Sequence, residues 1–123
     1  MERDEVRVMV VDDVADSADV LALVLEMDGY TTRAVNSAEE ALLAIDEFEP
    51  LCMMIDINMP GLGGHGLARQ LRARFGAGIV LIAVTGEGRD DDRISDRFAQ
   101  FDHYLRKPVD MDLLRKVLPP AES

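Results

Sequence analysis

Polar side chains follow short apolar runs at intervals along the whole chain. If these runs are parallel strands of one sheet, their carboxyl ends meet at one edge, and the side chains that follow them gather there. Carboxylates brought together raise one another's pKa unless a cation neutralises them, so such a cluster predicts a cation site. The residues in these positions are Asp12, Asp13, Asp56, Thr85 and Lys107.

The donor types favour Mg²⁺ over a softer metal. Oxygen ligands from a few side chains, completed by water, suit magnesium, and the chain offers no histidine or cysteine cluster for zinc. Lys107 adds a point charge for a phosphoryl oxygen and Thr85 adds a hydroxyl donor. Each residue alone reads as an ordinary turn or surface residue, so only the set indicates phosphoryl chemistry.

The elements that must position this set are strands with apolar side chains on both faces. Residues 6–11, 51–55 and 79–84 are β-rich apolar runs, as expected for central strands covered on both sides. Residues 31–35 alternate like an edge strand, and residues 102–105 form a short fifth candidate. Helical patterns separate the runs, which predicts a doubly wound α/β domain with a parallel sheet.

Two helices are predicted in the first half of the chain. In the first, four apolar residues at i, i+3, i+4 and i+7 are expected to form the buried face, with Gly29 as C-terminal cap: Val20, Leu23, Val24 and Met27. In the second, Ser37 and Glu40 form a capping box and Pro50 prevents continuation. Its apolar stripe comprises Ala41, Ala44, Ile45 and Phe48.

Three further helices are predicted in the second half. One carries Leu67, Leu71 and Phe75, and one at 90–98 opens with three aspartates. Asp110 is expected to cap the last, whose apolar residues are Leu113, Leu114, Val117 and Leu118.

Length and composition agree with one compact acidic domain. The 123 residues carry 13 Lys and Arg against 24 Asp and Glu, a formal charge of −11, which disfavours binding to DNA or anionic lipid. We expect a folded domain at 6–118 with a short lead at 1–5 and a tail at 119–123. The single cysteine, Cys52, lies in an apolar run, and no stretch is long enough to span a membrane, so a reducing, cytoplasmic location is expected.

Four motifs, in order, resemble the receiver domains of two-component response regulators. They are Val8–Asp13, Ile55–Gly61, Val84–Gly86 and Tyr104–Pro108, and the resemblance covers nearly the whole chain. It implies a flavodoxin-like (βα)5 fold with five parallel strands in the order 2-1-3-4-5. Residues 101–103 and 107–110 further resemble receivers attached to hybrid sensor histidine kinases.

The resemblance also implies a role for each matching residue. Asp56 would be the phosphoacceptor, and Asp12 and Asp13 would bind Mg²⁺ together with Asp56 and the backbone carbonyl of Asn58. The remaining site residues would be Thr85 and Lys107, which grip the phosphoryl oxygens, and Tyr104, which packs inward as a switch.

The implied partners are proteins. The phosphoryl group would come from a sensor histidine kinase or a histidine phosphotransfer protein, and the signal would leave through the fourth helix, fifth strand and fifth helix, at 90–118. The resemblance implies no direct nucleic acid contact and no enzymatic activity beyond the domain's own phosphorylation and dephosphorylation.

The loop after Pro60 departs from the family pattern. Glycine stands at position 63, where an aspartate is common, and at position 66, where a larger residue is common. Glycine inside a helix costs up to about 1 kcal/mol against alanine, so a frayed or delayed helix start is expected. Residues 61–66 also match the G-x-G-x-x-G dinucleotide pattern, but five residues separate them from the strand, so a flexible loop is preferred. The two histidines, His65 and His103, lack spaced partners and are expected at the surface or in turns.

Two other functions remain open from the residues. A haloacid-dehalogenase-like phosphatase also uses a strand-end aspartate, Mg²⁺, a threonine and a lysine, but Asn58 stands where that family has its general acid. A receiver-like module that binds partners without being phosphorylated is the other alternative, and the presence of every charged site residue argues against it.

Overall fold

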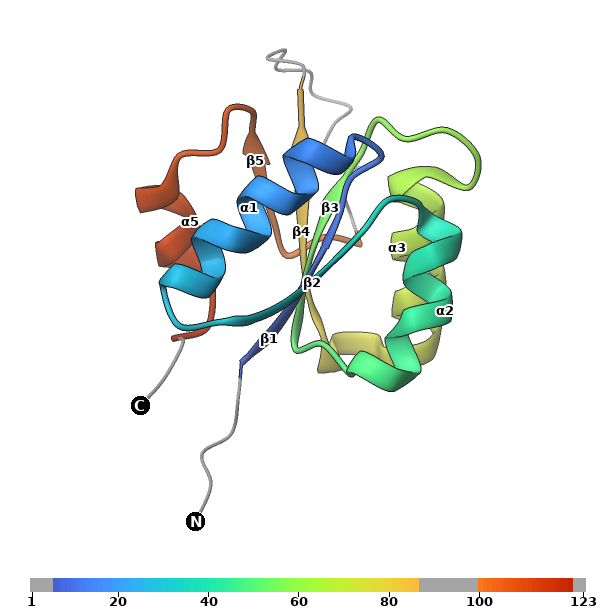
Figure 1. The fold of residues 1–123 in the computed structure, drawn as a ribbon. Coiled ribbons are helices and arrows are strands. Elements are labelled where there is room, and N and C mark those ends of the chain that lie inside the picture. The colour runs from blue at the N-terminus through green and yellow to red at the C-terminus, as the bar shows by residue number, and fades with distance from the viewer. Residues whose placement is uncertain (1–5, 87–99, 121–123) are drawn as a thin grey trace.

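The computed structural model describes residues 6–86 and 100–120, which form a five-stranded sheet with helices on both faces (Figure 1). The strand order is β2-β1-β3-β4-β5, and every neighbouring pair is parallel, so the predicted order is confirmed. The strands are β1 (Arg7–Val11), β2 (Thr31–Val35), β3 (Cys52–Asp56), β4 (Val80–Thr85) and β5 (His103–Arg106).

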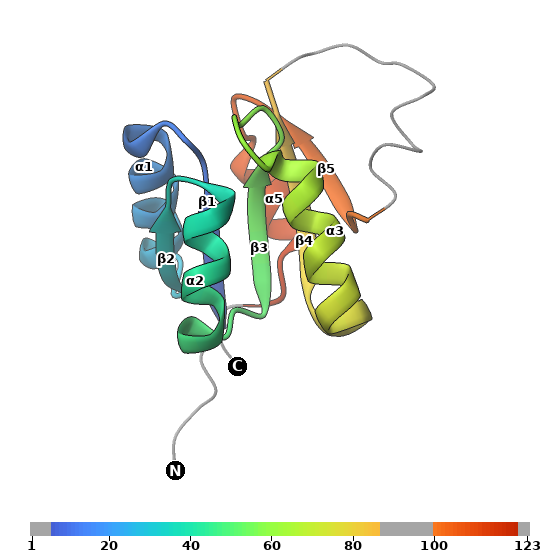
Figure 2. The same ribbon diagram turned by 90° about the vertical axis from the view of Figure 1, so that its right-hand side faces the viewer.

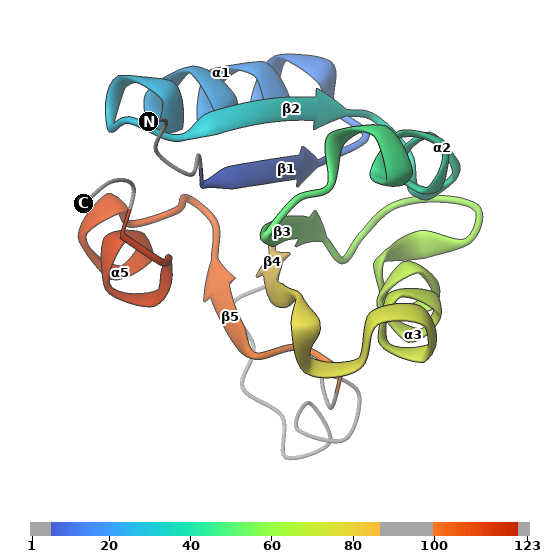
Figure 3. The same ribbon diagram turned by 90° about the horizontal axis from the view of Figure 1, so that it is seen from below.

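Within residues 6–86 and 100–120, two helices cover each face of the sheet. Helices α1 (Ala15–Met27) and α5 (Met111–Val117) lie on one face, and α2 (Ala38–Phe48) and α3 (Gly63–Phe75) lie on the other (Figures 1 and 3). A short 3₁₀ turn, η1 (Gly76–Gly78), joins α3 to β4. The helix predicted at 90–98 lies outside the described residues. None of the described helices combines the length and the hydropathy that crossing a membrane requires.

The central strands are apolar on both faces because both faces are covered. All five residues of β3 are buried, and Cys52 is buried there as predicted. Its side chains alternate between two cores, so Met53 and Ile55 pack under α2 and α3 while Met54 packs under α1 and α5. Figure 2 looks onto the α2 and α3 side of this arrangement.

The predicted buried face of α1 is wrong. Its contact with the sheet is made by Ala18, Ala22 and Leu25, which are buried at i, i+4 and i+7. The small side chains of Ala18 and Ala22 let the helix lie close to the strands, and most of the large side chains predicted to face the core turn outward. Val20, Leu23 and Met27 are 61%, 57% and 78% exposed, and Val24 is half-buried.

The ends of α1 and α2 follow the predicted capping. Gly29, at φ 103°, follows α1 in a Schellman motif, because Tyr30 N–H donates to the Leu25 carbonyl and Gly29 N–H donates to the Glu26 carbonyl. At the start of α2, Ser37 Oγ accepts from Glu40 N–H at 2.9 Å, which confirms the cap. The predicted α2 stripe packs into the core.

The expected delay of α3 is also wrong, since the helix begins at Gly63 and includes Gly66. A Cβ at Gly64 would lie 2.6 Å from the Asp56 carbonyl oxygen, so the first turn of α3 packs directly on the end of β3. Gly64 therefore permits a close approach of helix and strand, and Gly63, Gly64 and Gly66 belong to α3 and not to a flexible loop. His65 lies within this helix and is half-buried, with its ring nearly perpendicular to that of Phe101 at a centroid distance of 6.1 Å. This position corrects the prediction of a surface or turn residue.

The last elements match the prediction with small shifts. Strand β5 begins one residue later than expected, and His103 at its start is exposed. Asp110 caps α5 by accepting from the N–H groups of Asp112 and Leu113 at 2.9 and 3.4 Å. Leu114 and Leu118 are buried, whereas Leu113 is exposed.

Candidate functional site

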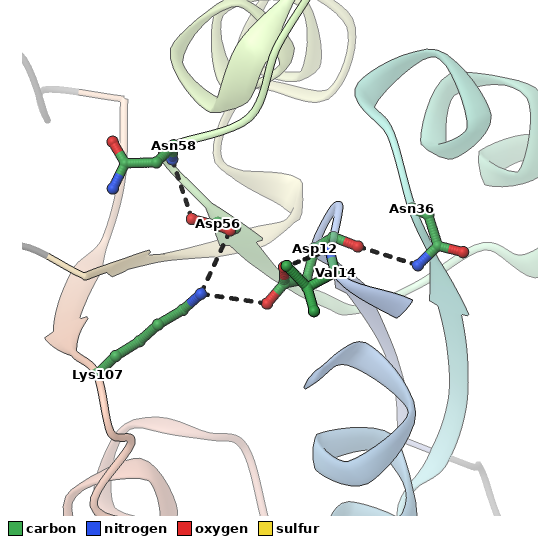
Figure 4. Close-up of polar contacts among 6 residues, drawn as sticks. All are labelled: Asp12, Val14, Asn36, Asp56, Asn58 and Lys107. Carbon is green, nitrogen blue, oxygen red and sulfur yellow. Dashed lines mark hydrogen bonds and ion pairs between the residues drawn. The ribbon is translucent and has the colours of Figure 1, made fainter. Parts of the chain in front are cut away.

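Three predicted site residues meet at the carboxyl ends of β1, β3 and β5 (Figure 4). Asp12 follows β1 directly, Asp56 is the last residue of β3, and Lys107 follows β5. Strands β1 and β3 are neighbours with Val11 opposite Ile55, which brings the two aspartates to the same level of the sheet. Parallel pairing therefore places together residues that are 95 positions apart in the chain.

The predicted carboxylate cluster is present. Asp12, Asp13 and Asp56 each offer one oxygen, and these oxygens all lie within 4.8 Å of one another. Asp12 and Asp56 are only 6% and 4% exposed, whereas Asp13 is exposed. Two buried carboxylates and one exposed carboxylate at this spacing form an oxygen-only donor set, which fits a hard divalent cation such as Mg²⁺.

Among the described residues, Lys107 is the positively charged side chain that contacts this carboxylate cluster. Its Nζ lies 3.3 Å from Asp12 Oδ2 and 3.3 Å from Asp56 Oδ2, so it bridges the two buried acids. Burial alone lowers the pKa of Lys107, but the charges of Asp56 and Asp12 outweigh it and the pKa is raised. Lys107 is therefore firmly protonated at neutral pH.

The Asp56 carboxyl has a raised pKa, mainly because burial disfavours its charged form. The Asn58 N–H donates to Asp56 Oδ1 at 2.9 Å and opposes this shift, as does the charge of Lys107. The neighbouring charge of Asp12 adds to the rise. A cation bound between the aspartates would favour the ionised, nucleophilic form.

The turn after β1 is held by three hydrogen bonds. Asp12 N–H donates to the Val35 carbonyl at 3.1 Å, and Asp12 Oδ1 accepts from Val14 N–H at 3.0 Å. The Asn36 side chain donates from Nδ2 to the Asp12 carbonyl oxygen at 3.0 Å. Sequence reasoning missed Asn36, because nothing in the residue pattern indicates a contact between a loop amide and a distant backbone carbonyl.

The other predicted residues lie close to this cluster or at the neighbouring strand end. Thr85 ends β4, and its carbonyl accepts from Lys107 N–H at 2.8 Å, which fixes the two residues side by side. Asn58 is exposed in the loop after β3. Tyr104 lies on β5 opposite Ala83 and is 56% exposed.

An apolar groove runs from this site between α1 and the segment leading into α5. Its volume is about 540 Å³, and Asp12, Asp56 and Lys107 lie among its lining residues. Most of the remaining lining is apolar, including Val20, Leu21 and Val24 of α1, with Val109 and Met111 opposite. The carboxylate cluster thus borders an open apolar surface.

Comparison with known protein families decides the assignment. A model of the response regulator receiver domain matches residues 8–119. The chain belongs to the response regulator receiver family. Receiver domains act with histidine kinases in two-component signal transduction, so the phosphatase and dinucleotide-binding alternatives lose their support.

Relatives and solved structures agree with the receiver assignment. The DNA-binding response regulator MtrA of Mycobacterium tuberculosis is 33% identical over 102 residues, which are 83% of this chain and 44% of that protein. The receiver chain thus spans less than half the length of MtrA. A 14.6 kDa protein of Leptolyngbya boryana is 34% identical over 112 residues, covering 89% of this chain and 86% of that protein.

Two crystal structures are similar over most of their length. A receiver protein from Pseudomonas putida has a TM-score of 0.83 and 30% identity, covering 94% of this chain and 96% of that one. The response regulator TrrA of Thermotoga maritima, in complex with Mg²⁺ and BeF, has a TM-score of 0.79 and 27% identity, covering 89% and 93%. Both likenesses support the fold of this receiver.

Proposed function

We propose that this receiver accepts a phosphoryl group on Asp56 from a phosphohistidine of a partner protein, in a reaction that depends on Mg²⁺. The observation that carries the proposal is the placement of the Asp56 carboxylate at a strand end, 3.3 Å from Lys107 and within 4.8 Å of two further acids. Three acids and a lysine gathered at one edge of the sheet suit a site that binds a divalent cation together with a phosphoryl anion.

Asp56 acts as the nucleophile. One carboxylate oxygen attacks the phosphorus atom, an O–P bond forms, and the P–N bond to the histidine breaks with its electron pair left on the ring nitrogen. Asp12, Asp13, Asp56 and the Asn58 backbone carbonyl would hold Mg²⁺, which when bound neutralises charge on the phosphoryl oxygens. The Asn58 N–H orients the Asp56 carboxylate for attack through Oδ1.

Lys107 and Thr85 bind the phosphorylated form of Asp56 and respond to it. The acyl phosphate adds negative charge and acceptor oxygens, so conformers that place the Lys107 ammonium and the Thr85 hydroxyl against it gain stability. Tyr104 starts from an exposed position and packs inward when Thr85 moves. The changed surface includes β5 and α5, and its predicted fourth-helix part lies outside the described residues.

The partner that delivers the phosphoryl group is a sensor histidine kinase or a histidine phosphotransfer protein that docks on α1. The exposed apolar side chain of Val20 lines the groove beside Asp56, and Leu23 is exposed on the same helix. An exposed apolar patch next to a site is typical of a protein contact. The downstream target is also a protein, because a formal charge of −11 disfavours nucleic acid and anionic membrane. The domain works in the cytoplasm and catalyses only its own phosphorylation and dephosphorylation.

The test is labelling with a small phosphodonor such as acetyl phosphate and Mg²⁺, followed by intact-mass measurement. A labile adduct of one phosphate should form on the wild type and be absent from Asp56→Asn. Equal labelling of that variant would show that the site is wrong. A wild type that takes no label but still binds its partner would favour the interaction module that is never phosphorylated.

A further inference from the structure

Asn36 is not one of the charged residues of the site, but its side chain forms a hydrogen bond with the backbone of one of them, Asp12. It follows β2, and its Nδ2 donates to the Asp12 carbonyl oxygen at 3.0 Å (Figure 4). The preceding residue, Val35, accepts from Asp12 N–H at 3.1 Å. The end of β2 therefore binds both polar backbone groups of Asp12.

This contact fixes the peptide between the two metal-binding aspartates. Asp12 O belongs to the Asp12–Asp13 peptide, so an Asn36 hydrogen bond to it restrains the plane that sets the direction of Asp13. Among the described residues, no hydrogen bond or ion pair holds the exposed Asp13 carboxylate itself. The position of that carboxylate thus depends on the backbone beneath it.

Asn36 is in turn anchored to the start of α2. Its N–H donates to Glu40 Oε1 at 2.6 Å, and Glu40 N–H donates to Ser37 Oγ at 2.9 Å. Ser37 is the residue whose side chain caps α2, so the Asn36 side-chain amide does not serve as the cap. Within the described residues, the Asn36 side-chain amide makes its hydrogen bond to the Asp12 carbonyl oxygen.

We propose that Asn36 is a positioning residue for the metal site, which preorganises the Asp12–Asp13 pair for Mg²⁺. The inference rests on the proposed function, because it assumes that these acids bind the cation. Groups that orient metal ligands change metal affinity by about 10- to 100-fold, and preorganisation acts by removing the ordering cost of binding. Asn36 is exposed, so we expect a smaller weakening in Asn36→Ala, of about 3- to 10-fold, at or below the lower limit of that range.

The test is to titrate the full chain with Mg²⁺ and to measure binding from the ¹H–¹⁵N NMR chemical shifts of the Asp13 and Val14 amides. Asn36→Ala should raise the Mg²⁺ dissociation constant, while the extent of acetyl phosphate labelling at saturating Mg²⁺ stays at the wild-type level. Ser37→Ala is the matched control, because it removes the helix cap one residue away and keeps the Asn36 amide. It should lower the thermal midpoint with an unchanged dissociation constant.

The outcomes separate this inference from the function on which it rests. If the wild type binds Mg²⁺ and Asn36→Ala binds it equally well, the inference is overturned and the proposed function stands. The same holds if Ser37→Ala weakens binding as much as Asn36→Ala, because the effect then comes from the α2 terminus. A wild type that binds no Mg²⁺ overturns the proposed function and the inference together.

Discussion

At the scale of single residues, the site is a compromise between reactivity and stability. Asp56 is 4% exposed, and in the proposed reaction it must be ionised to act as the nucleophile, although burial raises its pKa. Lys107 and the Asn58 N–H compensate in part, at 3.3 and 2.9 Å. The domain without metal therefore keeps a carboxylate in an environment that disfavours its charge.

Asp56→Asn should therefore raise the free energy of unfolding of the Mg²⁺-free domain at neutral pH, by roughly 1 kcal/mol, a usual size for a stabilising substitution at a destabilised site. A carboxyl whose pKa is higher in the folded state costs stability once it is ionised in both states, above the raised pKa. That cost disappears as the pH falls below the pKa of the unfolded chain. Urea unfolding with a chelator, from about pH 8 down to about pH 4, close to the ordinary pKa of an aspartate, should show the gain shrinking as the pH falls.

Asp46→Asn is the control for this prediction. Asp46 is an exposed carboxylate that pairs with Arg74 at 2.6 Å on the surface, so its removal should change stability by less than about 1 kcal/mol. If Asp56→Asn instead destabilises the Mg²⁺-free domain at neutral pH, the ion pair with Lys107 outweighs the cost of burying Asp56.

At the scale of elements, the strands and most helix ends could be predicted from the sequence, but one helix face could not. Capping by Ser37 and Asp110 is local chemistry and was predicted correctly. The contact face of α1 depends on how closely the helix approaches the sheet, and Ala18 and Ala22 carry too little apolar surface to stand out in a pattern. The large apolar residues that suggested a buried face, Val20, Leu23 and Met27, lie on the exposed side of α1.

That outer face should matter for phosphotransfer and little for folding. The double substitution Val20→Gln and Leu23→Gln should slow transfer from the cognate kinase by roughly tenfold, equal to about 1.4 kcal/mol, because a few anchors dominate interface energy. Labelling by acetyl phosphate should be unchanged, since Asp56 is untouched. The readout is the rate of transfer from the phosphorylated kinase.

Leu43→Gln provides the matched control for the α1 substitutions. Leu43 is 84% exposed on α2, which covers the opposite face of the sheet. Kinase transfer to this variant should proceed at the wild-type rate. A loss equal to that of the α1 variant would mean that general surface apolarity, and not the α1 face, controls transfer.

Arg72 shows a second limit of sequence reasoning at this scale, because an arginine on a helix resembles a solvated residue. In the structure it ties α3 to η1, β4 and the start of β5. Its guanidinium donates to the Gly76, Ile79 and Gln100 carbonyls at 2.6, 2.8 and 2.8 Å, and to Asp102 Oδ2 at 2.7 Å. Asp102 Oδ2 also accepts from Leu81 N–H at 2.8 Å.

Arg72→Met should lower the free energy of unfolding by about 2 kcal/mol, because it strands several part-buried acceptors at once. Urea unfolding measures the change. Arg74→Met is the comparison, since Arg74 pairs only with exposed Asp46 among the described acids, and it should cost less than about 1 kcal/mol. Equal losses in the two variants would contradict a clamping role for Arg72.

At the scale of the whole molecule, charge and metal binding are linked. The chain carries a formal charge of −11, and three of its acids lie together at the carboxyl ends of β1 and β3. Overall charge and the carboxylate cluster could both be predicted, from composition and from strand-end positions. The backbone support from Asn36 could not, because it depends on how the loops after β1 and β2 lie against each other.

Mg²⁺ should therefore stabilise the folded domain through one specific site and not through general screening. A ligand that binds only the folded state at ten times its dissociation constant stabilises it by about 1.4 kcal/mol, which a chelator should reverse. Thermal unfolding with Mg²⁺, and with NaCl at the same ionic strength, separates the two effects, because screening depends on ionic strength alone. Asp13→Asn keeps the buried pair but removes one ligand, so its response to Mg²⁺ should be much smaller. An equal rise in the midpoint with NaCl, or in Asp13→Asn, would mean that the acidic surface as a whole binds the cation, and that the three aspartates do not form a metal site.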